Sequence, residues 1–152
     1  MAEDIWKPHV TVAAMVEQNN KFLLVKEKIK GEILYNQPAG HLEPDESLLE
    51  AVVRETMEET QYDFTATALQ GIYRFIPDAS SVSSYIRLLF RGTVGTNHKG
   101  RLDEGIISVE WMSYEEIKAC RLQHRSPLVL QCIEDYINKP PFPLDVISQQ
   151  FA

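Results

Sequence analysis

Apolar and polar residues follow a strand-like pattern through the first forty residues of the chain. Residues 9–16 (HVTVAAMV) and 22–26 (FLLVK) are apolar runs of strand length, and the polar residues 17–20 between them end in two asparagines. Asparagine tolerates positive φ, so the pattern predicts two strands joined by a hairpin turn. A shorter run at 33–35 (ILY) predicts a further strand, which leads into a turn marked by proline and glycine at 37–40.

A helical period replaces the strand pattern after residue 46. Ser47 is followed three residues later by Glu50, which is the spacing of a capping box at the start of a helix. Apolar or β-branched residues then recur three and four positions apart, as a helix with one buried face requires. They are Leu49, Val52, Val53, Thr56 and Thr60. The carboxylates of the same segment are expected to lie mostly off this face.

Strand and helix signals are mixed in the second half of the chain. Aromatic and β-branched residues are frequent at 65–76 and 84–95, which predicts a second hairpin. Residues 106–112 predict one more strand, and a capping box at Ser113 predicts a short helix after it. A last helix is expected within 126–138, where apolar residues recur at roughly helical spacing.

The order of these elements predicts a fold class. Strands and helices do not alternate strictly, and a hairpin precedes the first helix, so we expect an α+β fold with a mixed sheet covered by helices. A length of 152 residues suits one domain over 1–152 with a full-sized core. The tail after the last helix either packs through Val146, Ile147 and Phe151 or remains mobile.

Composition narrows the class of function. The chain has 22 acidic residues against 15 Lys and Arg, for a formal net charge of -7, which argues against a surface for polymeric nucleic acid. A small phosphate-bearing molecule stays compatible if a metal neutralises its site. Cys120 and Cys132 lack a metal-binding spacing and are expected to be reduced core thiols. Because neither a signal peptide nor an apolar run of membrane length is visible, we expect a cytoplasmic protein without membrane contact.

The candidate chemistry concentrates in the helix predicted after Gly40. Residues three and four apart share a helix face, so Glu55, Glu58 and Glu59 are expected to crowd their carboxylates together. At about 5 Å and an effective dielectric of about 20, each pair repels by roughly 3 kcal/mol. A hard divalent cation with oxygen ligands relieves this repulsion, so the helix predicts a metal site.

The spacing of these acids matches a known motif, the Nudix box. Six residues fall in register with its Gly, Glu, Arg-Glu and Glu-Glu positions: Gly40, Glu46, Arg54, Glu55, Glu58 and Glu59. Such agreement arises by chance about once in ten million starting points. Three slots differ from the usual pattern without loss of a carboxylate, and they hold Thr56, Gln61 and Tyr62. Gln61 replaces a glycine of the left-handed helix end, at a cost on the order of 1 kcal/mol.

Three further segments resemble the small bacterial Nudix phosphatases of the NudJ type. They are residues 8–13 (PHVTVA), 36–43 (NQPAGHLE) and 125–129 (RSPLV). The resemblance implies a Nudix αβα sandwich with a central mixed sheet. It also implies hydrolysis of a pyrophosphate bond that depends on Mg²⁺, with Mn²⁺ as a substitute, and that releases phosphate. The implied substrates are nucleoside di- and triphosphates or hydroxymethylpyrimidine diphosphate.

Two other functions stay open, as does the oligomeric state. A nucleoside triphosphate pyrophosphatase would release pyrophosphate instead of phosphate. A Nudix module that binds a nucleotide without turnover receives slight support from the altered positions Thr56 and Gln61, but it would not need all three box carboxylates. In each case the partner is a small phosphoanhydride, and both a monomer and a homodimer are compatible with the sequence.

The resemblance assigns roles within the box. Glu58, Glu59 and the carbonyl oxygen of Gly40 correspond to metal ligands. Glu55 corresponds to a residue that either binds metal or orients and deprotonates the attacking water. Arg54 is expected to hold a neighbouring box carboxylate in place rather than to contact a substrate phosphate.

Residues around the box have weaker assignments. Glu46 corresponds to a structural acid that pairs with Arg54. Glu104, beside Asp103, matches a loop acid that completes metal coordination or acts as a base, with solvated loop acids as the alternative. Residues near the glycine that either bind substrate or satisfy backbone groups are Asn36, Gln37 and His41. Strand cations that could reach a substrate phosphate are Lys26, Arg74 and Arg87, and aromatic residues that could stack on a base are Tyr35, Tyr73 and Phe75.

Overall fold

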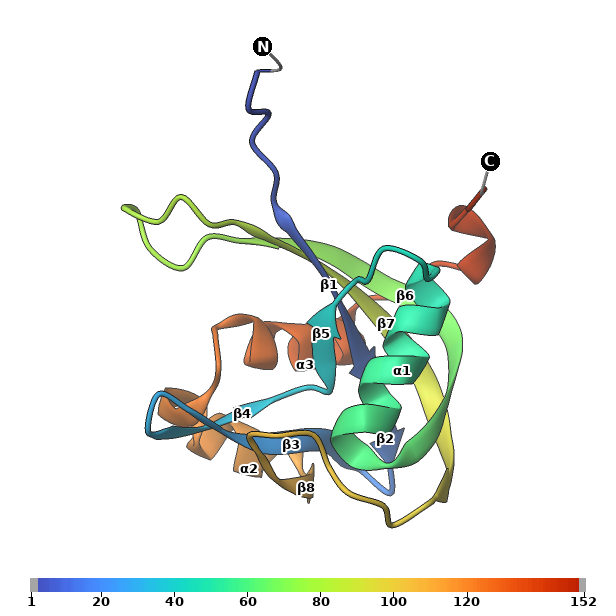
Figure 1. Cartoon of the computed structure of the whole chain (residues 1–152). Helices are drawn as coiled ribbons and strands as arrows, with labels where there is room; N and C mark the ends of the chain where they lie inside the picture. The colour runs from blue at the N-terminus through green and yellow to red at the C-terminus, as the bar shows by residue number, and fades with distance from the viewer. Residues whose placement is uncertain (1–2, 151–152) are drawn as a thin grey trace.

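The computed structural model describes residues 3–150, so the two residues at each end of the expected 1–152 domain lie outside the described part. Its strands are β1 (His9–Met15), β2 (Glu17–Gln18), β3 (Lys21–Ile29), β4 (Glu32–Asn36), β5 (Ala39–His41), β6 (Tyr62–Phe75), β7 (Tyr85–Asn97) and β8 (Ile106–Met112). Its α-helices are α1 (Leu48–Thr60), α2 (Tyr114–Ala119) and α3 (Leu128–Asn138), with 3-10 helices η1 (Arg121–Gln123) and η2 (Leu144–Val146). Figure 1 shows this order along the chain.

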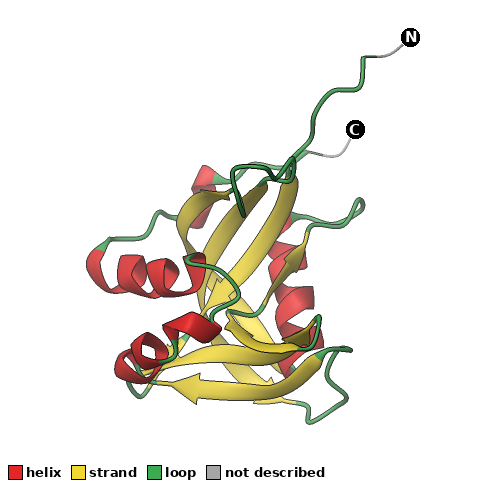
Figure 2. Ribbon diagram, turned by 90° about the vertical axis from the view of Figure 1, so that its left-hand side faces the viewer, coloured by secondary structure: helices red, strands yellow, loops and turns green. Residues whose placement is uncertain are grey.

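The strands form two four-stranded sheets. The first has the order β5-β1-β7-β6 and is mixed, because β1 and β7 run parallel while the other neighbours are antiparallel. In the second, β3 pairs antiparallel with β2, β4 and β8. Helices cover the sheets on both sides (Figure 2). The predicted α+β class with a mixed sheet between helices is therefore confirmed, with two sheets in place of one.

The first hairpin differs from its prediction. Asn19 and Asn20 do have positive φ, at 53° and 61°, but the turn joins β2 to β3 and not β1 to β3. β1 enters the other sheet instead, between β5 and β7. The physical reason is burial: residues 12–16 are buried on both faces, so this strand needs neighbours on both edges and layers on both sides.

Alternate residues of β1 point into two cores. Val12 and Ala14 pack in the cluster that contains Ala51 and Val52 of α1. Ala13 and Met15 pack in the second cluster, with buried residues of α2 and α3. Because successive strand residues face opposite sides, one apolar run supports the helices on both faces. This arrangement fixes α1, which carries the box, against β1 and β5.

The helix with the box begins as predicted. Ser47 is its N-cap, and both hydrogen bonds of the capping box with Glu50 are present. The prediction of the buried face is wrong at one position, because Val53 is 40% exposed while Ala51 is fully buried. Thr56, in a slot that is usually apolar, is buried with its hydroxyl donating to the Val52 carbonyl at 2.7 Å.

The end of α1 shows how a glutamine replaces the usual glycine. Gln61 adopts the left-handed conformation, with φ of 64°. Its side-chain amide donates to the carbonyls of Met57 at 3.1 Å and Arg101 at 3.0 Å. These bonds compensate for the backbone cost and tie the loop before β8 to the helix end.

The later elements agree with their predictions. β6 and β7 form the second hairpin, β8 spans 106–112, and Ser113 caps α2 with a complete capping box. α3 lies within the predicted 126–138. Of the tail, Ile147 packs against the core and Val146 is 53% exposed, while Phe151 is outside the described residues.

The structure also bears on the state of the cysteines and on membrane-spanning helices. Cys120 and Cys132 are both free thiols, and Cys132 is buried. Among the helices of residues 3–150, none combines the length and the apolarity that a membrane crossing requires.

Candidate active site

The box residues meet where α1 packs against β5. Gly40 lies in β5 opposite Val12 of β1. The Glu55 carboxylate lies so close to the Gly40 backbone that a Cβ added at Gly40 would overlap it. The motif therefore needs glycine here for a steric reason, because any side chain would displace the carboxylate.

Arg54 connects the acidic residues of the box. Its Nε and Nη2 donate to the two oxygens of Glu46 at 2.8 and 2.6 Å, which is the pair expected from the sequence. Its Nη1 donates to Glu55 Oε1 at 2.8 Å and to Glu58 Oε2 at 3.2 Å. Nη2 also donates to the His41 carbonyl at 3.0 Å. One guanidinium thus holds three carboxylates and partly offsets the repulsion expected between them.

Glu46→Gln is expected to lower the free energy of unfolding by about 1 kcal/mol at pH 7, because it weakens the fork between Glu46 and Arg54. The Arg54 hydrogen bond lowers the pKa of Glu46 from its usual 4.5. A carboxyl whose pKa is lowered by folding stabilises the folded state above pH 4.5. This stabilisation is lost as the pH falls through the lowered pKa of the folded state. Urea denaturation at pH 7 and pH 3 should therefore show the difference from wild type shrinking at pH 3.

Glu43→Gln is the matched control for this change. Glu43 lies 3.7 Å from Arg54 and its side chain is 63% exposed, so its loss should change stability by less than about 0.5 kcal/mol. Equal losses for Glu43→Gln and Glu46→Gln would contradict the structural role of Glu46.

Glu59 is the buried acid of the site. It is 9% exposed and accepts a hydrogen bond from the Ala39 backbone N–H at 3.1 Å. Burial, together with the nearby charges of Glu55, Glu27 and Asp103, raises its pKa to about 9. Burial also raises the pKa of Glu55, against the opposing effect of Arg54. Neither carboxylate has enough positive charge nearby to offset the cost of burying its ionised form.

This donor set fits a divalent cation. Within residues 3–150 no three acidic, His or Cys side chains already converge as a metal cage, because Arg54 holds Glu55 and Glu58 while Glu59 faces Ala39. The donors are nevertheless hard oxygens beside a backbone that only glycine leaves open. Hard oxygen donors of this kind suit Mg²⁺, Mn²⁺ or Ca²⁺.

The loop before β8 brings an acid to the box. The Asp103 backbone N–H donates to the Glu58 carbonyl at 2.9 Å. The charge of Asp103 acts on both Glu55 and Glu59. The loop acid expected from the sequence, Glu104, is the next residue along the chain, and its role stays a prediction.

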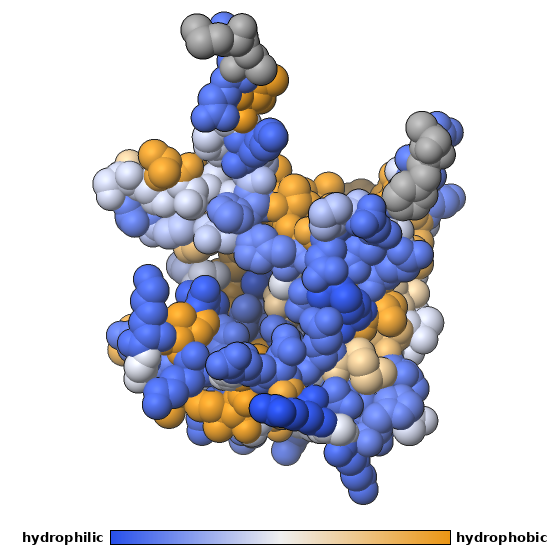
Figure 3. Space-filling view, viewed as in Figure 1, coloured by the Kyte–Doolittle hydropathy of each residue, from blue (hydrophilic) through white to orange (hydrophobic). Residues whose placement is uncertain are grey.

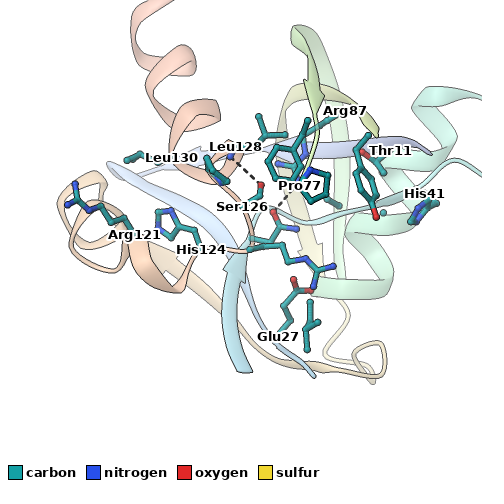
Figure 4. Close-up of a pocket in the computed structure, with 18 of the residues that line it drawn as sticks. Thr11, Glu27, His41, Pro77, Arg87, Arg121, His124, Ser126, Leu128 and Leu130 are labelled. Atoms are coloured by element: carbon teal, nitrogen blue, oxygen red, sulfur yellow. Dashed lines mark hydrogen bonds between the residues drawn. The ribbon is translucent and has the colours of Figure 1, made fainter. Parts of the chain in front are cut away.

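A pocket of about 1040 Å³ opens beside the box, with Gly40 in its lining. Figure 3 shows this face hollowed between the tip of the β6–β7 hairpin and the β3–β4 hairpin. Its cationic lining residues are Lys30, Arg87, Arg121 and Arg125, and its one Asp or Glu is Glu27. Its apolar lining includes Phe75, Pro77, Leu122 and Leu130. In Figure 4, Arg87 and Glu27 enter from opposite sides, with Arg121 at the far end.

The predicted substrate residues separate into two groups. Asn36 and His41 line the pocket. His41 Nε2 lies 3.0 Å from His9 Nδ1, so its ring is partly engaged within the protein. Gln37 is fully buried and does not line the pocket, because its side chain bonds to the Val129 carbonyl and to Arg87.

The three candidate cations differ in whether they line the pocket. Arg87 is the one that lines the pocket. Arg74 donates to Ser84 and lies over Trp6, while Lys26 lies over Tyr35. Among the aromatic candidates, Phe75 lines the pocket, Tyr73 is buried in the core, and Tyr35 packs against that core.

The sequence reasoning missed Glu27, Arg121 and Arg125. An available signal for the two arginines was their density, since residues 121–125 (RLQHR) contain three basic side chains. For Glu27 the strand gave no such signal, because this acid lies between Lys26 and Lys28. The backbone N–H of Arg125 donates to the Tyr35 carbonyl at 2.8 Å, which holds this segment beside β4.

Comparisons with known proteins agree with this geometry. The family model for the NUDIX domain matches residues 7–131. Phosphatase NudJ of Shigella boydii serotype 4 (strain Sb227) is 41% identical over 146 residues, which cover 95% of this chain and 93% of that protein. The structure of a NUDIX hydrolase from Nitrosomonas europaea has a TM-score of 0.90 and 46% identity, and covers 95% of this chain and 98% of its own.

A more distant structure contains a metal ion. It is a bifunctional NMN adenylyltransferase/ADP ribose pyrophosphatase from Francisella tularensis, complexed with AMP and a manganese ion. It has a TM-score of 0.65 and 25% identity, and the match covers 90% of this chain and 43% of that one.

Proposed function

Since the chain belongs to the Nudix hydrolase family, we propose that it cleaves its phosphoanhydride substrate with Mg²⁺ and releases phosphate. The proposed substrates are nucleoside di- and triphosphates or hydroxymethylpyrimidine diphosphate, bound by a single domain over residues 1–152. The observation that carries the proposal is the position of Gly40, which lies against the box carboxylate of Glu55 and also lines a pocket with four Lys and Arg residues.

The proposed metal ligands are the carboxylates of Glu58 and Glu59 and the carbonyl oxygen of Gly40. When bound, a divalent cation supplies positive charge that stabilises the phosphoryl oxygens in the transition state. Burial of Glu59 and the glycine-only approach at β5 support this assignment. Mn²⁺ shares this oxygen chemistry and is expected to substitute.

Glu55 is proposed to take the proton of the attacking water at Oε2, because its Oε1 accepts from Arg54. Arg54 then positions the carboxylate and does not touch the substrate, since its donors are directed at Glu46, Glu55, Glu58 and the His41 carbonyl. Burial raises the pKa of the Glu55 carboxyl and so favours proton uptake, and the negative charge of Asp103, next to Glu104, acts in the same direction.

A product assay tests the proposal. Wild-type protein is incubated with a panel of nucleoside di- and triphosphates plus hydroxymethylpyrimidine diphosphate, with Mg²⁺ or with chelator. We expect phosphate as the product, and only with metal present. Release of pyrophosphate would replace the proposal with a pyrophosphatase, and lack of turnover on every substrate would favour a binding module.

A further inference from the structure

We propose that Arg87 is the phosphate-binding residue of the pocket, where its guanidinium binds an anionic oxygen of the substrate's phosphate chain. The inference rests on the proposed function and deepens it, because it assigns the cation that receives the phosphate. Three observations about Arg87 support the inference. The side chain is buried without an ion pair, its orientation is fixed by hydrogen bonds, and its strand position lies close to Gly40.

Arg87 is a buried cation that forms no direct ion pair with a carboxylate of the described residues. It is 7% exposed and lines the pocket. Its Nη1 donates to Gln37 Oε1 at 3.0 Å and its Nη2 to Asn36 Oδ1 at 3.1 Å, and both acceptors are neutral amides. No ion pair of Arg87 occurs within residues 3–150. Because a buried charge is costly unless it is paired, the site has capacity for an anion.

Hydrogen bonds to buried residues beneath the pocket surface fix the orientation of the Arg87 side chain. Gln37 is fully buried, and its Nε2 donates to the Val129 carbonyl at 2.9 Å. This bond turns Gln37 Oε1 toward Arg87. Nη1 of Arg87 also lies 4.0 Å from Cys132 Sγ. The guanidinium has five N–H donors, and the two amide oxygens leave others for a ligand.

The sheet places Arg87 near the box. Arg87 of β7 pairs in register with Thr11 of β1, and Thr11 pairs with His41 of β5, the residue after Gly40. Two strand spacings separate the outer residues of this row, or about 10 Å. All of these residues line the same pocket. A phosphate chain bound at Arg87 would therefore lie in the same pocket as Gly40 of the box.

The other charges of the pocket differ from Arg87. Glu27 is its one Asp or Glu, and burial raises the pKa of this carboxyl, against the opposing charges of Arg125 and Arg87. Arg121 and Arg125 are exposed, whereas Arg87 is buried. The apolar lining residues Phe75 and Leu130 indicate that the bound phosphate is carried on a partly apolar molecule, as in a nucleoside phosphate.

The test uses two substitutions of Arg87 and a control on the same strand. Arg87→Gln removes the charge, and Arg87→Lys keeps the charge without the planar fork. Arg91→Gln is the matched control, because Arg91 is a partly buried arginine of β7 that bonds to Gln70 and to the carbonyls of Tyr136 and Lys139. Arg91 is not a lining residue of the pocket.

Four quantities are measured for each protein. They are the Kd for inorganic pyrophosphate by calorimetry in chelator, the KM and kcat for a nucleoside diphosphate with Mg²⁺, and the Tm. We expect Arg87→Gln to raise both Kd and KM by about 10- to 100-fold with a smaller change in kcat. Arg87→Lys should recover part of the loss. Arg91→Gln should leave Kd and KM within about 2-fold, whatever its Tm.

Gln37→Glu keeps Arg87 in place and neutralises the charge of its guanidinium with a buried carboxylate. It should raise the Kd for pyrophosphate by about 10-fold or more, because the buried carboxylate would pair with the guanidinium. This variant also decides the question if Arg87→Gln does not fold. Its own Tm is expected to fall, since the Val129 carbonyl loses a donor.

Several outcomes would overturn the assignment. One is wild-type Kd and KM in Arg87→Gln with only the Tm changed, which would make Arg87 purely structural. Another is an equal loss of binding in Arg91→Gln. Failure of wild type to bind pyrophosphate would also overturn it. Loss of turnover on every substrate would contradict the proposed function alone, because the calorimetry still measures the role of Arg87.

Discussion

Glu58→Gln is expected to reduce kcat by about 1000-fold or more while leaving the Tm close to that of wild type. The carboxylate is a proposed metal ligand, and a charge interaction of about 4 kcal/mol in the transition state corresponds to three powers of ten in rate. The side chain is 40% exposed, and it forms an ion pair with Arg54 at 3.2 Å. Glutamine keeps an oxygen for that contact, so stability should change little.

The measurement for Glu58→Gln combines phosphate release with thermal melting and a Mn²⁺ titration. Metal affinity should fall together with kcat. Glu43→Gln is the control, because Glu43 also lies beside Arg54 but outside the box, and it should keep wild-type turnover. Wild-type turnover in Glu58→Gln would show that the metal assignment is wrong.

Gly40→Ala is expected to reduce kcat by about 100-fold with little loss of stability. The added Cβ would overlap the Glu55 carboxylate. That carboxylate ends a flexible side chain, so the fold can adjust at small cost by moving it. A displacement on the order of 1 Å at a reacting group costs about 100-fold in rate. Gly40 lies in a strand that does not need positive φ, so alanine fits its backbone.

Gly95→Ala is the control for this substitution. Gly95 also lies in a strand, and its added Cβ would meet only the Cβ of Asp63, at 3.9 Å, which is ordinary contact. It should retain both kcat and Tm. Full activity of Gly40→Ala would contradict the close approach of Glu55 to β5, and unfolding of Gly40→Ala would show that the overlap involves more than one flexible side chain.

The local features of the fold could be predicted because their signals are local. Ser47 and Ser113 start helices through capping boxes, in which both partners lie within three residues of each other. The pairing of Glu46 with Arg54 follows from motif spacing, and the structure contains it. Asn19 and Asn20 marked a turn correctly because positive φ is a property of single residues.

The features that were missed depend on contacts between distant segments. The partner of β1 is set by a parallel pairing with β7, which is more than 70 residues away, and apolar pattern alone favoured its sequence neighbour β3. The pocket likewise combines Glu27 of β3, Arg87 of β7 and Arg125 after η1. No spacing in the sequence links these three residues, so only the folded chain identifies them as neighbours.

The loop acid shows the limit of motif matching. Glu104 occupies the expected place in the sequence, but the backbone of Asp103 is the one bonded to Glu58. A backbone bond does not decide which of the two side chains faces the site, and no periodic pattern constrains a loop, so the role of Glu104 stays a prediction. Arg54 and the box acids Glu55, Glu58 and Glu59 lie on one helix with fixed spacing, and for that reason their relative positions could be anticipated.

The central claim is that the box carboxylates bind a divalent cation that the reaction requires. The most direct measurement is phosphate release by wild-type protein after complete chelation, before and after Mg²⁺ is restored, with Glu58→Gln treated in parallel. We predict that wild type loses turnover in chelator and recovers it with Mg²⁺, while Glu58→Gln does not recover. Undiminished turnover in chelator, or equal recovery by Glu58→Gln, would contradict the claim.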